Sequence, residues 1–158
     1  MDECWLDVSG SVNLFGDGFA IAEEIRESVR KETGLTISVG VSFNKVFAKL
    51  GSDMKKPDAV PVISKENFKQ KVWPLPINDL LFVGKSTFEK LKSIGVTTIG
   101  DITMCDDKTL LRLLGKNGAM LKLHALGEDD TPVVPYTAEQ KPKSIGRSTT
   151  QRTTIYSD

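Results

Sequence analysis

Three short segments in the first 65 residues have the pattern of β-strands. Residues 3–8 alternate between polar and apolar side chains, so that Cys4, Leu6 and Val8 share one face. Residues 36–41 and 60–63 are rich in β-branched side chains, which favour strands. Between the first two strands, residues 10–18 are rich in turn-forming residues.

Amphipathic helices are predicted between these strands. An apolar stripe indicates a helix that begins at Asp17 or Gly18 and runs to about residue 33, with Gly34 suited to its C-terminal cap. A second helix begins after Ser42 or Asn44 and ends before Pro57, and a short third covers residues 65–71. Strands and helices in this order indicate an α/β layer with helices over a sheet.

The pattern changes after residues 73–76, where short helices with glycine turns replace strands. The predicted helices cover residues 77–81, 85–94, 99–104, 106–113 and 116–126. From about residue 137 the chain is too poor in apolar residues to build a core of its own. We therefore expect domains at 1–73 and 74–136, followed by a third region at 137–158.

Composition excludes several classes of protein. No apolar run is long enough to span a bilayer, and no signal peptide is visible. Cys4 and Cys105 lack metal-ligand spacing and are expected to be free thiols in the cytoplasm. His124 is the only histidine and lies on an apolar helix, so a packing or surface role is expected rather than catalysis.

The net charge of zero conceals segments of opposite sign. Residues 1–32 hold eight acidic and three basic side chains, whereas residues 43–72 hold seven basic and three acidic ones. A simple cationic clamp for nucleic acid is not expected, but local phosphate contacts are.

The acidic pair Asp2-Glu3 and the lysines that follow Asn44 carry the candidate chemistry. Two-metal phosphoryl transfer uses carboxylates that bridge divalent ions, although the pair taken alone is more typical of a solvated acidic terminus. Lys45, Lys49, Ser52 and Lys56 follow steps of four, three and four, and so form one polar helix face. Asp53 lies one turn before Lys56, where its carboxylate can orient the ammonium group. A solvated lysine face is the alternative for this helix.

The apolar and glycine pattern of residues 80–95 is typical of a helix–hairpin–helix. Val83 and Gly84 precede a helix that begins near Lys85, and backbone N–H groups at such a helix start bind DNA phosphates without reading sequence. A second such unit is expected at residues 114–119. A small helical bundle with glycine caps is the alternative.

In this order and spacing, these motifs resemble the Y-family (DinB/UmuC-like, ImpB/MucB/SamB) lesion-bypass DNA polymerases. The similar segments are residues 2–8, 37–49 and 52–57 in the palm, 84–95, 115–118 and 127–129 in the thumb, and 143–146 at the start of the little finger. The resemblance implies a partial α/β (α+β) palm with helices over a mostly antiparallel sheet, followed by a small all-α helix–hairpin–helix thumb. Residues 137–158 are then a linker and the start of a truncated little finger.

The resemblance also implies roles for individual residues. Asp2 and Glu3 are expected to ligate Mg²⁺, two ions of which serve the parent enzyme. Lys56, and less directly Lys49, is expected to contact the triphosphate. The backbone of Val83, Gly84 and Lys85 is expected to hold a primer-strand phosphate. Leu81 and Phe82 occupy positions that are often Pro and Gly in the family.

The expected function is translesion synthesis by the parent enzyme, with primer-template DNA and deoxynucleoside triphosphates as partners and a sliding clamp as an open candidate. The chain itself is expected to be an inactive palm-and-thumb fragment, because the first metal-binding aspartate and the fingers would lie upstream. Two alternatives stay open: a non-enzymatic helix–hairpin–helix DNA-binding module, and a family member that has lost catalysis and serves as a scaffold.

Overall fold

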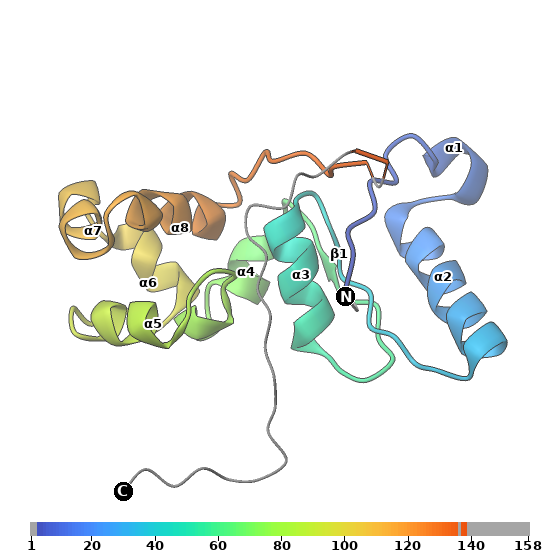
Figure 1. The fold of residues 1–158 in the computed structure, drawn as a ribbon, viewed down its shortest axis with the longest axis horizontal. Coiled ribbons are helices and arrows are strands. Elements are labelled where there is room, and N and C mark those ends of the chain that lie inside the picture. The colour runs from blue at the N-terminus through green and yellow to red at the C-terminus, as the bar shows by residue number, and fades with distance from the viewer. Residues whose placement is uncertain (1–2, 136, 139–158) are drawn as a thin grey trace, which may run out of the picture.

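The computed structural model of this 158-residue chain describes residues 3–135 and 137–138. Helices dominate it, and a small sheet lies near the middle (Figure 1). The elements are α1 (Val12–Phe15), α2 (Gly18–Thr33), β1 (Val41–Ser42), α3 (Lys45–Met54), β2 (Val62–Ile63), α4 (Phe68–Val72), the 3-10 helix η1 (Ile77–Asp79), α5 (Lys85–Lys92), α6 (Ile99–Met104), α7 (Asp107–Leu114) and α8 (Lys116–Leu126). In Figure 1, α5 to α8 gather at one end, α1 and α2 lie at the other, and α3 lies between them. None of the helices in the described part has the length and apolar character that a membrane crossing requires.

The long helices begin and end where their capping residues predict. The Asp17 carboxylate accepts a hydrogen bond from the Ala20 N–H at the start of α2, and Gly34 ends that helix at a φ of 73°. The Asn44 side chain caps α3 in the same way by accepting from the Phe47 N–H at 2.8 Å. The predicted starts and ends of α2 and α3 are therefore confirmed.

The two strands of the sheet run in parallel. Val41 pairs with Val62 and Ser42 with Ile63, and α3 forms the crossover between the strands. The prediction of a mostly antiparallel sheet is therefore wrong for the described residues. The reason lies in the connection, because a helical crossover returns the chain in the same direction.

Residues 3–8 do not form the predicted strand in the structure. The N–H groups of Val39 and Val41 donate to the carbonyls of Ala59 and Pro61, so these groups pair with residues 59–61 and not with residues 3–8. The turn-rich stretch that follows contains the short helix α1, which the sequence pattern did not predict. An alternating pattern predicts a strand only when a neighbouring strand is available to pair with it.

One continuous core joins the two halves of the chain. Phe47 and Leu50 of α3 belong to the same buried cluster as Leu91, Leu110 and Leu121 of the later helices. Trp73 lies at the junction, and its indole N–H donates to the Ala125 carbonyl at 3.0 Å. The domain boundary at residues 73–76 stays a prediction, and the packing across it is apolar.

Two glycines let α3 lie against the strand region with almost no separation. A Cβ at Gly40 would overlap the Ala48 carbonyl oxygen and lie 2.5 Å from the Ser52 nitrogen. A Cβ at Gly51 would lie 3.3 Å from the Gly40 Cα. This backbone contact sets the position of the polar face of α3 relative to the rest of the sheet.

Candidate functional site

Four charged side chains form a continuous row along α3, and we call Glu3, Lys49, Asp53 and Lys56 the charge row. The Lys49 ammonium lies 2.7 Å from Glu3 Oε1 and 2.7 Å from Asp53 Oδ2. Asp53 Oδ1 lies 2.7 Å from the Lys56 ammonium. The structure thus brings together Glu3, Lys49 and Lys56, three residues that sequence analysis selected from opposite ends of a stretch of more than 50 residues.

The ionisation of the central pair follows from these contacts. Burial disfavours the charged form of Lys49, but hydrogen bonds to Asp53 and Glu3 outweigh it and raise its pKa. Burial likewise opposes ionisation of Asp53, and the two lysines outweigh it and lower the pKa of the carboxyl. Both groups are therefore charged at neutral pH.

Trp5 connects the extended N-terminal segment to α3, which sequence analysis did not anticipate. Its indole N–H donates to the Lys45 carbonyl at 3.0 Å, and the Lys45 ammonium lies 6.0 Å from the ring centroid. This contact holds residues 3–8 beside α3 without strand pairing. The only signal for it in the sequence was an aromatic residue two positions after the acidic pair.

The predicted metal ligands are described in part. Asp2 lies outside the described residues, whereas Glu3 lies at the start of the charge row. No group of three or more His, Cys, Asp and Glu side chains that could hold a metal occurs within residues 3–135 and 137–138. The half-exposed Glu3 carboxylate is nonetheless the kind of hard oxygen donor that Mg²⁺ prefers. Glu3 fits the role of one ligand in a larger set.

A groove of about 590 Å³ opens beside the charge row. It runs between residues 3–8, α2 and residues 36–42, and its lining includes Glu3, Lys49 and Lys56. Apolar side chains cover most of its walls, and its charged lining residues are Glu3, Lys49, Lys56 and Asp58. The groove therefore gives access to three members of the charge row.

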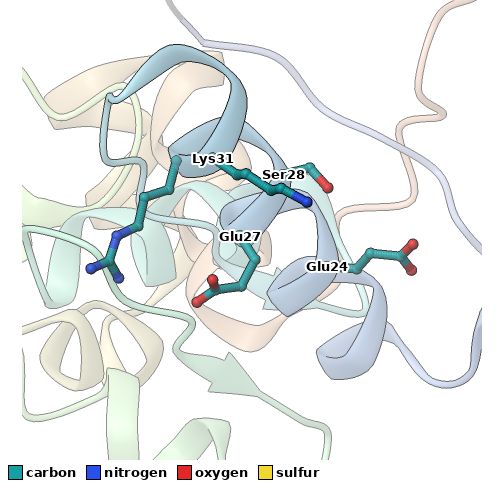
Figure 2. Close-up of a pocket in the computed structure, with 5 residues that line it drawn as sticks. Glu24, Glu27, Ser28 and Lys31 are labelled. Atoms are coloured by element: carbon teal, nitrogen blue, oxygen red, sulfur yellow. The ribbon is translucent and has the colours of Figure 1, made fainter.

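A second hollow on the outer face of α2 has a different character. Five residues of α2 alone line it, and Figure 2 shows its carboxylates and cationic groups spread apart around the helix. Glu24 and Lys31 are typical of this surface. We interpret it as the solvated face of an amphipathic helix.

The hairpin before α5 is the second candidate site. Gly84 is the N-cap of α5 and supplies no side-chain hydrogen bond, so the first N–H groups of the helix have no side-chain cap. A Cβ at Gly84 would meet nothing within 4 Å. Val83 anchors the turn in the core, while Lys85 begins the helix at the surface.

Phe82 has an unusual backbone conformation in this hairpin. Its φ is 71°, a region that favours glycine, and the residue is 63% exposed. The ring lies 5.8 Å from that of His124, which is itself buried in α8. The turn therefore keeps the conformation that glycine adopts easily, with phenylalanine in its place.

Comparisons with known proteins agree on one group. Residues 1–53 match the model of the impB/mucB/samB family. A DNA polymerase IV of Acetivibrio thermocellus is 57% identical over 95% of this chain and 38% of its own length. Another, from Alkaliphilus oremlandii, is 43% identical over 95% of this chain and 37% of its own length. The chain thus spans well under half of the curated relatives it matches.

Solved structures give the same result. The crystal structure of DinB from Sulfolobus solfataricus is similar with a TM-score of 0.72 at 27% identity, covering 81% of this chain and 38% of that one. A post-insertion binary complex of Dbh DNA polymerase is similar with a TM-score of 0.73 at 26% identity, over 81% and 38% of the two chains. Sequence and fold together show that this chain belongs to the impB/mucB/samB group of Y-family DNA polymerases.

Proposed function

We propose that this chain supplies part of the palm and the thumb of a translesion DNA polymerase, which adds deoxynucleotides to a primer by two-metal nucleotidyl transfer. The observation that carries the proposal is the charge row, because it joins a candidate metal carboxylate to a candidate phosphate-binding lysine. The two relatives described above are DNA polymerases IV, which supports the same activity.

Each residue has a part in this proposal. Asp2 and Glu3 bind Mg²⁺, which when bound lowers the pKa of the attacking hydroxyl and stabilises the leaving oxygen. Lys56 donates to the triphosphate. Its side chain is 57% exposed, so its ammonium is accessible to an incoming nucleotide. The Lys49 ammonium already pairs with two carboxylates, and it orients Glu3. It attracts the triphosphate through its positive charge, without a direct hydrogen bond.

The hairpin holds the DNA in this proposal. A helix start without a side-chain cap presents N–H groups to a phosphate oxygen. The open space at Gly84 lets a strand of DNA approach the backbone of Val83, Gly84 and Lys85 closely. We assign α5 to α8 and this hairpin to a helix–hairpin–helix thumb, and the residues after 136 to the approach to a little finger. A cytoplasmic location fits the two free thiols. A sliding clamp stays a prediction as a partner of the parent enzyme.

Activity is tested in a chimera that replaces the matching segment of the Acetivibrio thermocellus polymerase with this chain. We expect primer extension, and we expect Glu3→Gln to lower kcat by about 100-fold or more because a metal ligand is lost. Glu24→Gln on the outer face of α2 is the matched control and should retain full activity. A folded chimera in which Glu3→Gln and Glu24→Gln behave alike would contradict the assignment.

Binding by the hairpin is tested in the chain itself. We expect Gly84→Ala to weaken affinity for primer-template DNA by about 3- to 10-fold, since the added methyl group occupies the space for the phosphate. Gly10→Ala also places its methyl group in open space and is the matched control. The non-enzymatic alternative predicts different results. A pure DNA-binding module would keep its affinity for DNA when it carries Glu3→Gln. A chimera that contains such a module would not extend a primer.

A further inference from the structure

Asp53 holds two lysines at once, one on each carboxylate oxygen. Its Oδ2 lies 2.7 Å from Lys49, and its Oδ1 lies 2.7 Å from Lys56. The side chain is 44% exposed, so both contacts lie at the edge of the groove rather than in the core. A carboxylate in this arrangement fixes the separation of two cations.

Lys49 is the anchored end of this arrangement. Its side chain is only 20% exposed, and the second contact of its ammonium is with Glu3. Asp53 is consequently held from one side by a lysine that is itself fixed between two carboxylates. The rigid part of the row therefore ends at Asp53.

Lys56 is the end of the row that lies beyond the helix. Helix α3 ends at Met54, and Lys55 already has extended backbone angles, so the helix does not fix Lys56. A lysine side chain carries up to about 2 kcal/mol of rotamer entropy, which is lost when it is held in one place. The ion pair with Asp53 meets part of that cost before any ligand arrives.

The pairing leaves Lys56 able to bind an anion. An ammonium group has three N–H donors, and Asp53 Oδ1 occupies one of them. Within residues 3–135 and 137–138 the other two donors have no ion-pair partner and are open to phosphate oxygens. A held ammonium with free donors is preorganised for a ligand.

We propose that Asp53 is a positioning residue, which uses the anchored Lys49 to place the Lys56 ammonium for the triphosphate. This inference rests on the proposed role of Lys56 in binding that group. It names Asp53 as a residue that improves anion binding although its own charge repels the anion.

That opposition of signs gives a sharp test. Removing a carboxylate beside an anion site strengthens binding if simple charge decides, and weakens it if positioning decides. We therefore measure the affinity of this chain for inorganic tripolyphosphate by NMR titration. Asp53→Asn should weaken it by about 3- to 10-fold, because the amide NH2 that replaces one carboxylate oxygen is a donor and cannot accept from the second ammonium group.

Controls separate the positioning role from general effects. Asp107→Asn removes a carboxylate that also pairs with a lysine at 2.7 Å, that of Lys122, and should leave the affinity unchanged. Asp53→Glu keeps the charge and should restore part of the binding. The double variant Asp53→Asn with Lys56→Ala should bind no more weakly than Lys56→Ala alone, because Asp53 acts only through Lys56.

The outcomes distinguish the two proposals. If Lys56→Ala weakens binding and Asp53→Asn strengthens it or leaves it unchanged in a folded chain, charge alone decides and the positioning role is overturned. If Lys56→Ala leaves the affinity unchanged, or the wild-type chain does not bind tripolyphosphate, the proposed role of Lys56 fails and the inference about Asp53 fails with it. Thermal unfolding of each variant shows whether it is folded.

Discussion

The contact between Gly40 and α3 makes Gly40→Ala the substitution with the clearest expected effect. The new methyl group would overlap the Ala48 carbonyl oxygen and lie 2.5 Å from the Ser52 nitrogen, where 3.0 Å is the practical limit. Both neighbours are backbone atoms of a helix, so they cannot rotate away. The whole of α3 has to retreat from the strand region, by roughly 1 Å.

The cost follows from the side chains that α3 buries. Val46, Phe47 and Leu50 are almost fully buried. A buried leucine makes 40–60 contacts of about 0.1–0.2 kcal/mol each, and a gap of 0.5–1 Å forfeits a quarter or more of that energy. The loss is about 1–3 kcal/mol per side chain that loses its neighbours. With two such side chains affected, Gly40→Ala should lower the free energy of unfolding by about 2–6 kcal/mol.

Urea denaturation followed by circular dichroism measures this change, with Gly10→Ala as the control. A Cβ at Gly10 meets nothing within 4 Å, and its φ is not in the left-handed region, so this variant should match or slightly exceed the wild type. At about 2–4 °C per kcal/mol, Gly40→Ala should lower Tm by roughly 4–24 °C. If the two variants unfold within about 0.5 kcal/mol of each other, the close approach does not govern the position of α3.

Two further predictions concern titration and capping in the later helices. Burial lowers the pKa of His124 below its usual value of 6.5, and the charge of Asp129 opposes this shift. The folded chain therefore binds the proton less readily than the unfolded chain. Its stability should fall as the pH drops through 6.5 and below. His124→Leu should flatten this dependence of Tm on pH, and an equal slope in both proteins would contradict the reasoning. Asp101 accepts from the N–H groups of Thr97 and Thr98, which lowers its pKa, while the Thr98 hydroxyl caps α6 in return. Asp101→Ala should lower the free energy of unfolding by about 1–2 kcal/mol at pH 7, and by progressively less below pH 3.8, where the wild-type carboxyl also loses its charge. If urea denaturation shows a loss that does not change with pH, the capping role is refuted.

The extent to which sequence predicted this structure depended on how local each feature is. The ends of α2 and α3 were predictable because Asp17, Asn44 and Gly34 act on backbone within a few residues of themselves. The pairing of Lys49 with Asp53 also follows from their i,i+4 spacing. The parallel direction of β1 and β2 follows from the helix that was predicted between them, but the resemblance to the family led us to expect a mostly antiparallel sheet.

The same distinction applies to the candidate site. Glu3 and Lys49 are 46 positions apart, and no local rule joins them. Their contact requires the extended segment to be held by Trp5 and α3 to be seated at Gly40. Resemblance to a family indicated which residues belong together, and the packing of α3 shows how they come together.

The side chain of Asn44 has a consequence for how force passes through the molecule. Its oxygen caps the start of α3, and its amide nitrogen donates to the Gly127 carbonyl at the end of α8, at 3.0 Å. One planar group therefore couples the ends of two helices, and Trp73 adds a parallel link to Ala125. A displacement of the end of α8 therefore acts directly on the first turn of α3, through the two hydrogen bonds of one side chain. The charge row follows along the same helix, from Lys49 at about 8 Å from Asn44 to Asp53 at about 14 Å.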